Sequence, residues 1–418
     1  MITHDPSEYI RGLQQLLVSD KKKIAFLFGA GTSLAKKNND SLIVPAIATM
    51  TREIEESIIQ KGKIKMAIEE IKEEISIKKY TIETLLTNLE QKNQIIGKGK
   101  LNGLNAKDIR KLINDIKNLI REKVCIHKNS KFDLKNLIHV DFAEWVGKFD
   151  RKYPIEIFTT NYDYLFELGL ECHQIAYYDG FSGSYKPFFH PESVEDLLLL
   201  PNQTKLWKIH GSLGWHYDEK SKTVWRKDSD HEDILIYPST LKYDNSRKQP
   251  YYALGDRLTK FLKEPDTILI TCGYSFGDEH INERIITALK YNMSAHVFVL
   301  NYDIEYIQGK RVYSFDENSS LAIMAMKNNK ISVFSSRSAV IGSQYGIWKL
   351  KREPDKDSTL RVNLYFDEDG HTNSSEEMNI EKINEESWTG SGVLTITDFS
   401  KFVNFVQSVM SSPLINKI

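Results

Sequence analysis

The apolar run 24–28 is followed directly by a glycine-rich turn, Gly29-Ala30-Gly31-Thr32-Ser33. Such a run predicts a buried strand, and the two glycines let the backbone turn tightly and come close to a ligand. Backbone N–H groups at the start of a following helix would then point at a phosphate. We therefore expect a dinucleotide at this turn. A plain glycine turn is the alternative, because Leu34 stands where the usual dinucleotide pattern has its third glycine.

Four more short apolar runs, each followed by a polar motif, lie between residues 153 and 335: 155–158, 205–209, 267–271 and 296–300. Strands of this kind that alternate with helices are typical of a parallel α/β sheet, whose ligand lies at the carboxyl ends of the strands. The fold class that we predict is α/β, with a Rossmann-like parallel sheet, a helical insert and a small C-terminal α+β extension.

Two of the polar motifs bring candidate catalytic side chains to strand ends. Asn161, after the run 155–158, carries an amide that donates and accepts hydrogen bonds at once. His210, after the run 205–209, can titrate near neutral pH beside a glycine that gives access to the backbone. A turn that caps a helix is the alternative for Asn161 and Asp163, and a structural histidine is the alternative for His210.

The other two motifs provide candidate nucleotide contacts. A second glycine-rich turn after the run 267–271 contains Gly273 and Ser275, and its last residue is Asp278. After the last run, Asn301 and Asp303 offer an amide and a carboxylate that could hold ribose hydroxyls.

In this order, the motifs resemble those of the sirtuin (silent information regulator) family, and more narrowly its bacterial branch found in antiviral defence proteins. The resemblance extends over residues 23–303 with an interruption. It implies a Rossmann-type fold that takes NAD as its substrate, with Asn161 and His210 at the two catalytic positions. Asp163 is expected to fix its turn rather than take part in chemistry. The residues expected to bind NAD are Gly29, Ala30, Gly31, Ser33, Asp163, Gly273, Ser275 and Asn301.

The sequence also departs from the protein deacetylases of that family, which usually carry four zinc cysteines. Here three cysteines are scattered along the chain, so we expect no zinc site. The peptide-binding strand is replaced by Tyr-Pro-Ser-Thr at 237–240, and residues 36–45 replace the aromatic and acidic residues that hold nicotinamide. These differences favour water as the acceptor, and therefore hydrolysis of NAD to nicotinamide and ADP-ribose.

Three other functions stay open. An NAD-dependent dehydrogenase would need an acidic residue about 20 positions after the glycine turn, at the end of a second strand. Glu53 has this spacing, but it lies in a segment of helical periodicity. A protein deacylase would share the site without the zinc module, and a non-catalytic NAD or ADP-ribose sensor would need neither Asn161 nor His210.

The chain divides into three parts by pattern. Residues 1–50 and 139–345 form the expected NAD-binding core, and 51–138 is a helical insert with apolar residues at helical spacing. We expect the insert to cover the nucleotide fold rather than to serve as a dedicated partner surface. Residues 346–418 are predicted to form strands at 346–350, 361–366 and 393–396, then a helix from Phe399 capped by Thr397 or Asp398.

Charge and hydropathy limit the partners. Lys and Arg (56) nearly balance Asp and Glu (57), which argues against direct nucleic-acid binding. No apolar run is long enough for a membrane span, and the predicted location is cytoplasmic. The family resemblance implies homo-oligomers or a HerA-like hexameric ATPase partner. The Ile-rich insert and the C-terminal stripe of Phe399, Phe402 and Val406 offer apolar surface for such assembly, with internal core as the alternative.

Overall fold

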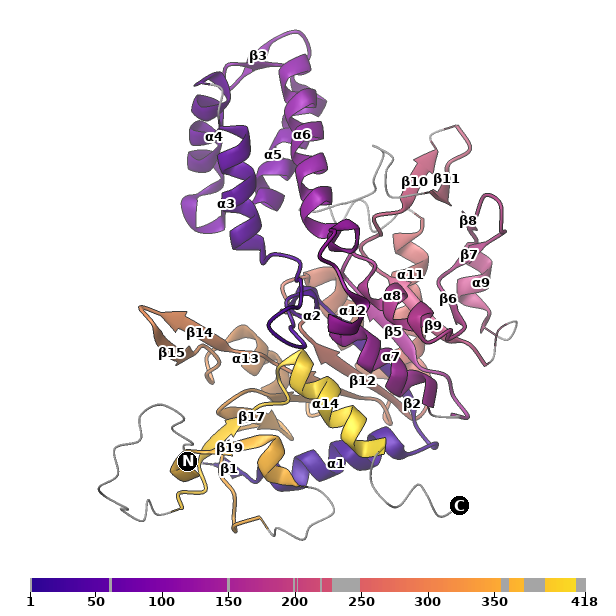
Figure 1. Cartoon of the computed structure of the whole chain (residues 1–418), viewed down its shortest axis with the longest axis vertical. Helices are drawn as coiled ribbons and strands as arrows, with labels where there is room; N and C mark the ends of the chain where they lie inside the picture. Colours follow the sequence, from indigo (N-terminus) through magenta and orange to yellow (C-terminus); the bar gives the residue numbers. More distant parts are fainter. Residues whose placement is uncertain are drawn as a thin grey trace.

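The structure is a computed structural model that describes residues 2–59, 62–148, 151–197, 200, 202–218, 220–227, 249–354, 361–371 and 388–410. Its centre is a ten-stranded sheet with the strand order β1-β18-β17-β16-β13-β12-β2-β5-β9-β6 (Figure 1). Its central strands run parallel to one another: β2 (Lys23–Phe28), β5 (Glu156–Thr159), β9 (Thr204–Lys208), β12 (Thr267–Cys272), β13 (His296–Leu300) and β16 (Ile331–Phe334). The predicted α/β fold with a Rossmann-like parallel sheet is confirmed.

Both faces of this sheet are buried, which explains why its strands read as mostly apolar runs. In β2, Phe26 and Phe28 pack on one face, whereas Ala25 and Leu27 pack on the other. The first face is covered by α1 (Pro6–Val18), α7 (Ile138–Lys148), α8 (Leu165–Cys172) and α14 (Phe399–Met410). The opposite face of the sheet is covered by α9 (Pro191–Glu195), α11 (Tyr251–Lys263), α12 (Glu279–Tyr291) and α13 (Ser320–Met326).

Further strands complete this sheet and form smaller sheets beside it. In the main sheet they are β1 (Thr3–His4), β6 (Tyr177–Tyr178), β17 (Ser338–Ile341) and β18 (Gln344–Trp348). A four-stranded sheet contains β7 (Phe181–Ser182), β8 (Phe188–Phe189), β10 (Trp215–Asp218) and β11 (Thr223–Arg226). A separate hairpin is formed by β14 (Ile304–Ile307) and β15 (Lys310–Tyr313).

Between β2 and β5 the chain forms a group of helices that stands away from the sheet (Figure 1). They are α3 (Ile47–Ile58), α4 (Gly62–Ile75), α5 (Ile82–Ile95) and α6 (Ala106–Val124), with a small hairpin of β3 (Lys100–Leu101) and β4 (Leu104–Asn105). Capping boxes at Thr81 and Asn105 begin α5 and α6. The regularly spaced isoleucines of these helices are buried against one another. Among the described residues, no helix is both long and apolar enough to cross a membrane.

The predicted strand at 361–366 is wrong. Val362–Leu364 is a 3-10 turn, and the strand β19 (Phe366–Glu368) begins only after it, paired with β20 (Gly392–Leu394). Val362 and Tyr365 are buried whereas Leu364 is 61% exposed, so the buried positions are three residues apart, as in a turn. The alternation of residue types at 361–366 therefore does not correspond to alternate faces of a strand.

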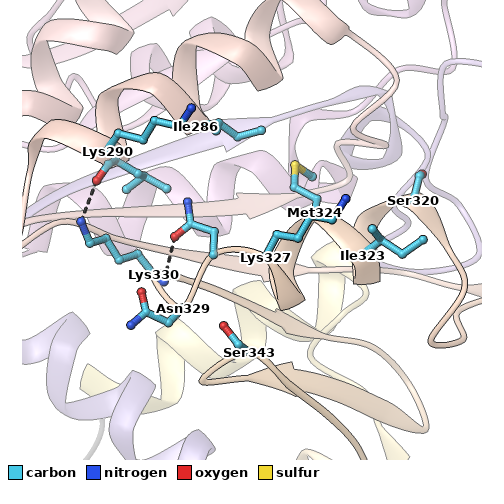
Figure 2. Close-up of a pocket in the computed structure, with 11 residues that line it drawn as sticks. Ile286, Lys290, Ser320, Ile323, Met324, Lys327, Asn329, Lys330 and Ser343 are labelled. Carbon is cyan, nitrogen blue, oxygen red and sulfur yellow. Dashed lines mark hydrogen bonds between the residues drawn. The ribbon is translucent and has the colours of Figure 1, made fainter.

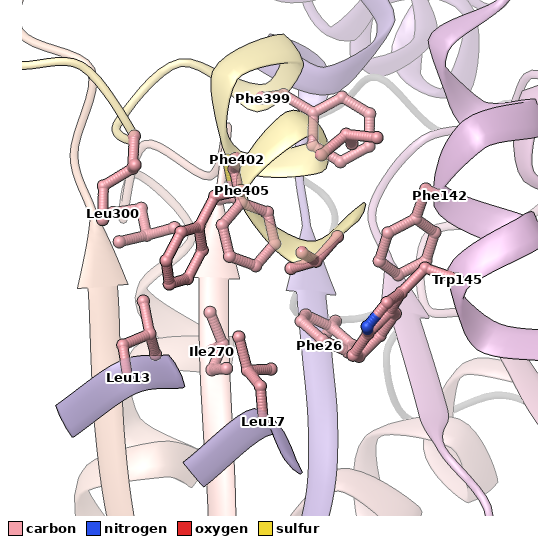
Figure 3. Packing of buried hydrophobic residues seen from close by; sticks show 14 of the residues in the cluster. Leu13, Leu17, Phe26, Phe142, Trp145, Ile270, Leu300, Phe399, Phe402 and Phe405 are labelled. Atoms are coloured by element: carbon pink, nitrogen blue, oxygen red, sulfur yellow. The ribbon is translucent and has the colours of Figure 1, made fainter. Parts of the chain in front are cut away.

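The C-terminal helix α14 packs inside the core rather than on the surface. Asp398 caps it by accepting a hydrogen bond of 2.8 Å from the backbone of Ser400. Phe399, Phe402 and Val406 are at most 2% exposed. Figure 3 shows the phenylalanines of α14 above Phe26 of β2 and beside α7. Of the two alternatives for this stripe, the structure shows internal core and not an assembly surface, because the sheet already covers it.

Candidate functional site

The structure brings the predicted site residues to one edge of the sheet. Asn301, Gly273, Gly29, Asn161 and His210 follow the carboxyl ends of β13, β12, β2, β5 and β9, which are neighbours in this order. Because these strands are parallel, their carboxyl ends share one edge. Along the chain, β5 and then β9 are added on one side of β2. The later strands β12 and then β13 are added on the other side of β2. Ligands of open α/β sheets bind where the strand order reverses in this way.

At this reversal the two glycine-rich turns touch backbone to backbone. Gly31 N donates to the carbonyl of Gly273 at 2.9 Å, and Gly29 N donates to that of Cys272 at 3.2 Å. A β-carbon at Gly31 would lie 2.6 Å from the α-carbon of Gly273, and one at Gly29 would lie 2.5 Å from its carbonyl oxygen. Gly273 itself has a φ of +64°. The glycines are therefore needed for the contact between the turns. This requirement is separate from any access that they give a phosphate to the backbone.

The residues after Gly29 form the short helix α2 (Ala30–Ser33). Ala30 is exposed, whereas Ser33 is 4% exposed and donates from its hydroxyl to Asp163 Oδ2 at 2.6 Å. The hydroxyl of Thr32 donates back to the carbonyl of Gly29 at 2.9 Å. Ser33 thus connects the glycine turn to the loop after β5.

Asn161 is the centre of this connection. It is 6% exposed, and its side-chain nitrogen donates to the carbonyl of Gly29 (3.1 Å), to Thr32 Oγ1 (3.1 Å) and to Ser33 Oγ (2.8 Å). Among the described residues, none donates to its side-chain carbonyl oxygen. Asn161 therefore holds the glycine turn with its amino group, and its oxygen is the atom left for a ligand or a water molecule.

His210 lies on the adjacent strand end, directly beyond Lys208 and Ile209. The backbone joins the two strand ends, because Ile209 N donates to the carbonyl of Thr159 at 2.8 Å. The His210 imidazole is 8% exposed, and its Nε2 lies 4.0 Å from Oδ1 of Asp278. Its ring centre is 5.6 Å from that of His280. The structure thus adds an acidic and a second imidazole group to the surroundings of His210.

Behind Asn161 lies a buried ionic cluster. Asp163 is 4% exposed and accepts at Oδ1 from the backbone N of Leu165 at 3.1 Å, a bond that fixes this turn. Lys208, the last residue of β9, donates to the backbone carbonyl of Asp163 and to Glu167 Oε1 of α8, the latter at 2.8 Å. Burial raises the pKa of Glu167, and the ammonium group of Lys208 opposes this shift.

The two remaining predicted residues lie farther along the same edge. Ser275 is exposed in the loop after β12, where its hydroxyl accepts from the backbone N of Gly277 at 3.3 Å. Asn301 donates from its side chain to Ser335 Oγ at 2.7 Å. Its amide therefore connects the ends of β13 and β16, and only part of its hydrogen-bonding capacity is left for a ribose.

The sequence of residues 155–323 matches the family model of the SIR2-like domain. The chain carries a SIR2-like domain. A comparison with curated proteins returned no significant match. Among solved structures, one titled "Structural Basis for the Mechanism and Regulation of Sir2 Enzymes" is similar over 72% of this chain and 88% of that one, with 13% identity. Its TM-score of 0.31 is too low to add to the argument.

The match to the SIR2-like domain begins at β5 and ends within α13. It therefore contains Asn161, His210, Gly273, Ser275 and Asn301, whereas the glycine turn after β2 lies outside it. The SIR2-like domain supports an NAD-related function. The hydrogen bonds from Asn161 and Ser33 explain how the turn outside the matched segment becomes part of the same site.

The helical insert lies directly against the loops of this site. Tyr162, next to Asn161, donates from its hydroxyl to Glu83 of α5 at 3.2 Å. Leu213, which follows His210, is buried in the apolar core of the insert together with Leu165 of α8. The segment 36–45 is also held nearby, since Ser41 donates to the backbone of Asn136 at 2.7 Å. The insert is thus packed on the site side of the domain.

Sequence reasoning missed three residues of this site. Asp278 was visible as the last residue of the second glycine-rich turn, but nothing local indicated that it faces His210. Lys208 stands in an apolar run, where a lysine gives no catalytic signal. Thr32, which accepts a hydrogen bond from Asn161, also gave no such signal in the sequence. By contrast, Glu53 lies on α3 of the insert, paired with Lys123, and not at a strand end, which argues against the dehydrogenase alternative.

Two further predictions concern a zinc site and the peptide-binding segment. The three cysteines are unbonded to each other, and among the described residues no group of His, Cys, Asp and Glu is arranged to hold a metal ion. Residues 237–240, expected in place of the peptide-binding strand, lie outside the described residues.

A pocket of about 840 Å³ lies elsewhere, between α12, α13 and the turn from β17 to β18 (Figure 2). Lys330, which lines it, directly precedes β16 and donates to the carbonyl of Leu289 at 2.7 Å. Lys290, near the end of α12, is also part of its wall. These positions are at the amino ends of the strands, so this pocket does not lie at the strand ends that carry Asn161 and His210.

Proposed function

We propose that this chain hydrolyses NAD at the bond between nicotinamide and ribose, giving nicotinamide and ADP-ribose. The observation that carries the proposal is the pair of polar side chains, Asn161 and His210, on adjacent parallel strand ends beside the glycine turn. The dinucleotide would lie along the strand ends from Asn301 to His210, with its phosphates near the glycine turns.

In the proposed reaction, water attacks the anomeric carbon of the nicotinamide ribose as the bond to nicotinamide breaks. The bonding electrons go to the ring nitrogen, which loses its positive charge. His210 takes a proton from the water or from a ribose hydroxyl, and passes it to solvent. Asn161 accepts a hydrogen bond from the water at its free carbonyl oxygen and holds it in line with the ribose.

The biological role that we propose is depletion of NAD in antiviral defence. A free NAD hydrolase would harm its own cell, so we expect activity to depend on homo-oligomers or on a HerA-like hexameric ATPase partner. Contacts made in such an assembly could favour a minor active conformation of the strand ends. The site lies beside the insert, whose helices are the nearest elements on which a partner could act.

The second candidate is a non-catalytic sensor of NAD or ADP-ribose. It is favoured by the three hydrogen bonds with which Asn161 holds the glycine turn, because these would also serve binding without turnover. A sensor gives no reason for His210 beside Asp278 at the same edge. The protein deacylase is a weaker candidate, because the chain has only three cysteines for a zinc module.

The test is chromatography of nicotinamide released from NAD by the purified chain, alone over a range of concentrations and with the ATPase partner. We expect Asn161→Ala and His210→Ala to lower turnover at least about a hundredfold, which is typical for loss of an acid–base or positioning group. Circular dichroism checks that both variants fold. Full activity in either variant refutes the assignment, and ADP-ribose binding without any turnover favours the sensor.

A further inference from the structure

Lys208 is a charged side chain buried where a strand normally carries an apolar one. It is 3% exposed and stands at the end of β9, in register with Thr159 at the end of β5. A buried ammonium group is costly unless it is paired and hydrogen-bonded. The partners of Lys208 therefore indicate what the charge does in this position.

Its partners belong to the loop that carries Asn161. The ammonium group donates to the backbone carbonyl of Asp163, two residues after Asn161, and to the carboxylate of Glu167 one helical turn later. It also lies 5.3 Å from the ring centre of Tyr164. Lys208 itself is two residues before His210. One side chain thus joins the segment of one proposed catalytic residue to the strand of the other.

Backbone contacts continue this connection on the ligand side. Leu213 N donates to the carbonyl of Tyr162 at 3.0 Å, and this bond joins the two loops. The bond from Gly211 N to the carbonyl of Lys208, at 3.1 Å, lies within the loop after β9. The two loops are therefore joined both by the Leu213–Tyr162 amide bond and by the ammonium group of Lys208, and the position of Asn161 relative to His210 depends on both.

We infer that Lys208 and Glu167 form a positioning pair that holds Asn161 and His210 in register for the reaction. The inference rests on the proposed function for its catalytic meaning. Neither residue touches the reacting atoms. Displacing a reacting group by about 1 Å can cost about a hundredfold in rate, so a pair that fixes two strand ends acts on turnover more than on binding.

The chain offers a matched control in Lys205. It lies on the same strand, is also 3% exposed, and donates to the backbone carbonyls of Leu200 and Gln203 at the other end of β9. Lys208→Met and Lys205→Met therefore remove the same group from the same strand with equal burial. Only the first change affects the segments that carry Asn161 and His210.

The first readout is kinetic. We expect Lys208→Met to lower kcat for NAD hydrolysis at least tenfold, with the Kd for ADP-ribose within twofold of the unmodified chain. Lys205→Met should leave kcat within twofold. The double variant Lys208→Met/Glu167→Gln leaves no carboxylate buried without its cation, so it should regain thermal stability while kcat stays low. Recovery of kcat together with stability would show a merely structural pair and overturn the inference.

The second readout needs no activity. Amide hydrogen exchange of the segments 159–164 and 209–213 should rise in Lys208→Met and stay unchanged in Lys205→Met. If the unmodified chain cleaves no NAD under any condition, the proposed function fails, while the positioning pair is judged on this exchange alone. Unchanged exchange of both segments in Lys208→Met overturns the positioning pair whatever the activity.

Discussion

Two buried ionic clusters lie at opposite ends of the same pair of strands, β5 and β9. At the amino end of β5, Glu156 is paired with Arg257 of α11 and with the indole of Trp207. At the carboxyl end, Glu167 is paired with Lys208. The cations of the two clusters, Arg257 and Lys208, are 4% and 3% exposed, and both clusters join elements that are far apart in the sequence.

They differ in how completely their polar atoms are paired. Oε2 of Glu156 accepts from Arg257 Nε at 2.9 Å and from Trp207 Nε1 at 2.7 Å, while Oε1 accepts from the second arm of the guanidinium. In Glu167, only Oε1 has a donor, and Oε2 has none within the described part of the chain. The amino-end cluster is thus closed: Glu156 and Arg257 form a bidentate pair, and both carboxylate oxygens have donors.

The carboxyl end thus keeps a buried acceptor, Oε2 of Glu167, without a donor in the described part of the chain. Such atoms cost free energy when they are buried without a partner. A chain that tolerates this cost at one end of two strands, and avoids it at the other, has a use for these atoms. We interpret the open cluster of Lys208 and Glu167 as the support of a ligand site. The closed cluster of Glu156 and Arg257 is part of the core.

Removal of Arg257 should give the largest effect on stability and none on chemistry. Arg257→Met leaves the carboxylate of Glu156 buried without a cation, and breaking a buried pair typically costs about 3–5 kcal/mol. Urea unfolding measures this loss, and kcat per folded molecule should stay unchanged. The exposed pair of Lys22 and Asp266 serves as control, since Lys22→Met should cost less than about 1 kcal/mol. A large loss of kcat in Arg257→Met would remove the distinction between the two clusters.

A side chain at Gly31 should affect only the carboxyl end of the strands, where the candidate site lies. The β-carbon of Gly31→Val would lie 2.6 Å from the α-carbon of Gly273, so one of the two turns must move. Overpacking of this kind costs about 1–3 kcal/mol, and we expect NAD to bind at least about tenfold more weakly by calorimetry. Gly12→Val in α1 is the control, because a β-carbon there would have no atom within 4 Å apart from its chain neighbours and the backbone of its own helix. Equal affinity in a folded Gly31→Val variant would mean that the turn is only structural.

The sequence predicts the strands of this fold and the edge at which the site lies, because both depend on local patterns. Buried parallel strands read as apolar runs, and the residues that follow them must gather at one edge. Asn161 and His210 could be placed there without knowledge of any contact. The helical insert is equally visible, because its apolar residues repeat at helical spacing.

What local patterns cannot predict is how distant segments meet. The bond from Asn161 to Gly29 joins residues 132 positions apart and exists only because β5 lies beside β2. The same holds for Lys208 and Glu167, whose roles depend on strand order. The burial of α14 was left open for this reason too, since an apolar stripe does not indicate whether a sheet or a partner covers it.

The smallest predicted effect compares two histidines, one at each end of the strands. Burial lowers the pKa of both His139 and His296 to about 4. His139, on α7, packs against Phe166 and Phe399 with neither ring nitrogen bonded within the described residues, and the nearby Asp163 opposes its shift. His296 begins β13 and has Ser332 Oγ 2.9 Å from its Nε2.

A histidine with a lowered pKa in the folded state stabilises the fold above pH 6.5, and this contribution is lost as the pH falls from 6.5 towards 4. The reason is that the unfolded chain takes up the proton first. At pH 5.5 the loss is about 1.4 kcal/mol for each residue. We expect His139→Phe to abolish its share of this loss with little change at pH 8, because its surroundings are aromatic. His296→Phe should abolish an equal share but cost about 1 kcal/mol at pH 8, the usual worth of its hydrogen bond to Ser332. Unfolding in urea at pH 8 and pH 5.5 measures both, and equal costs at pH 8 would show that His139 has a polar partner after all.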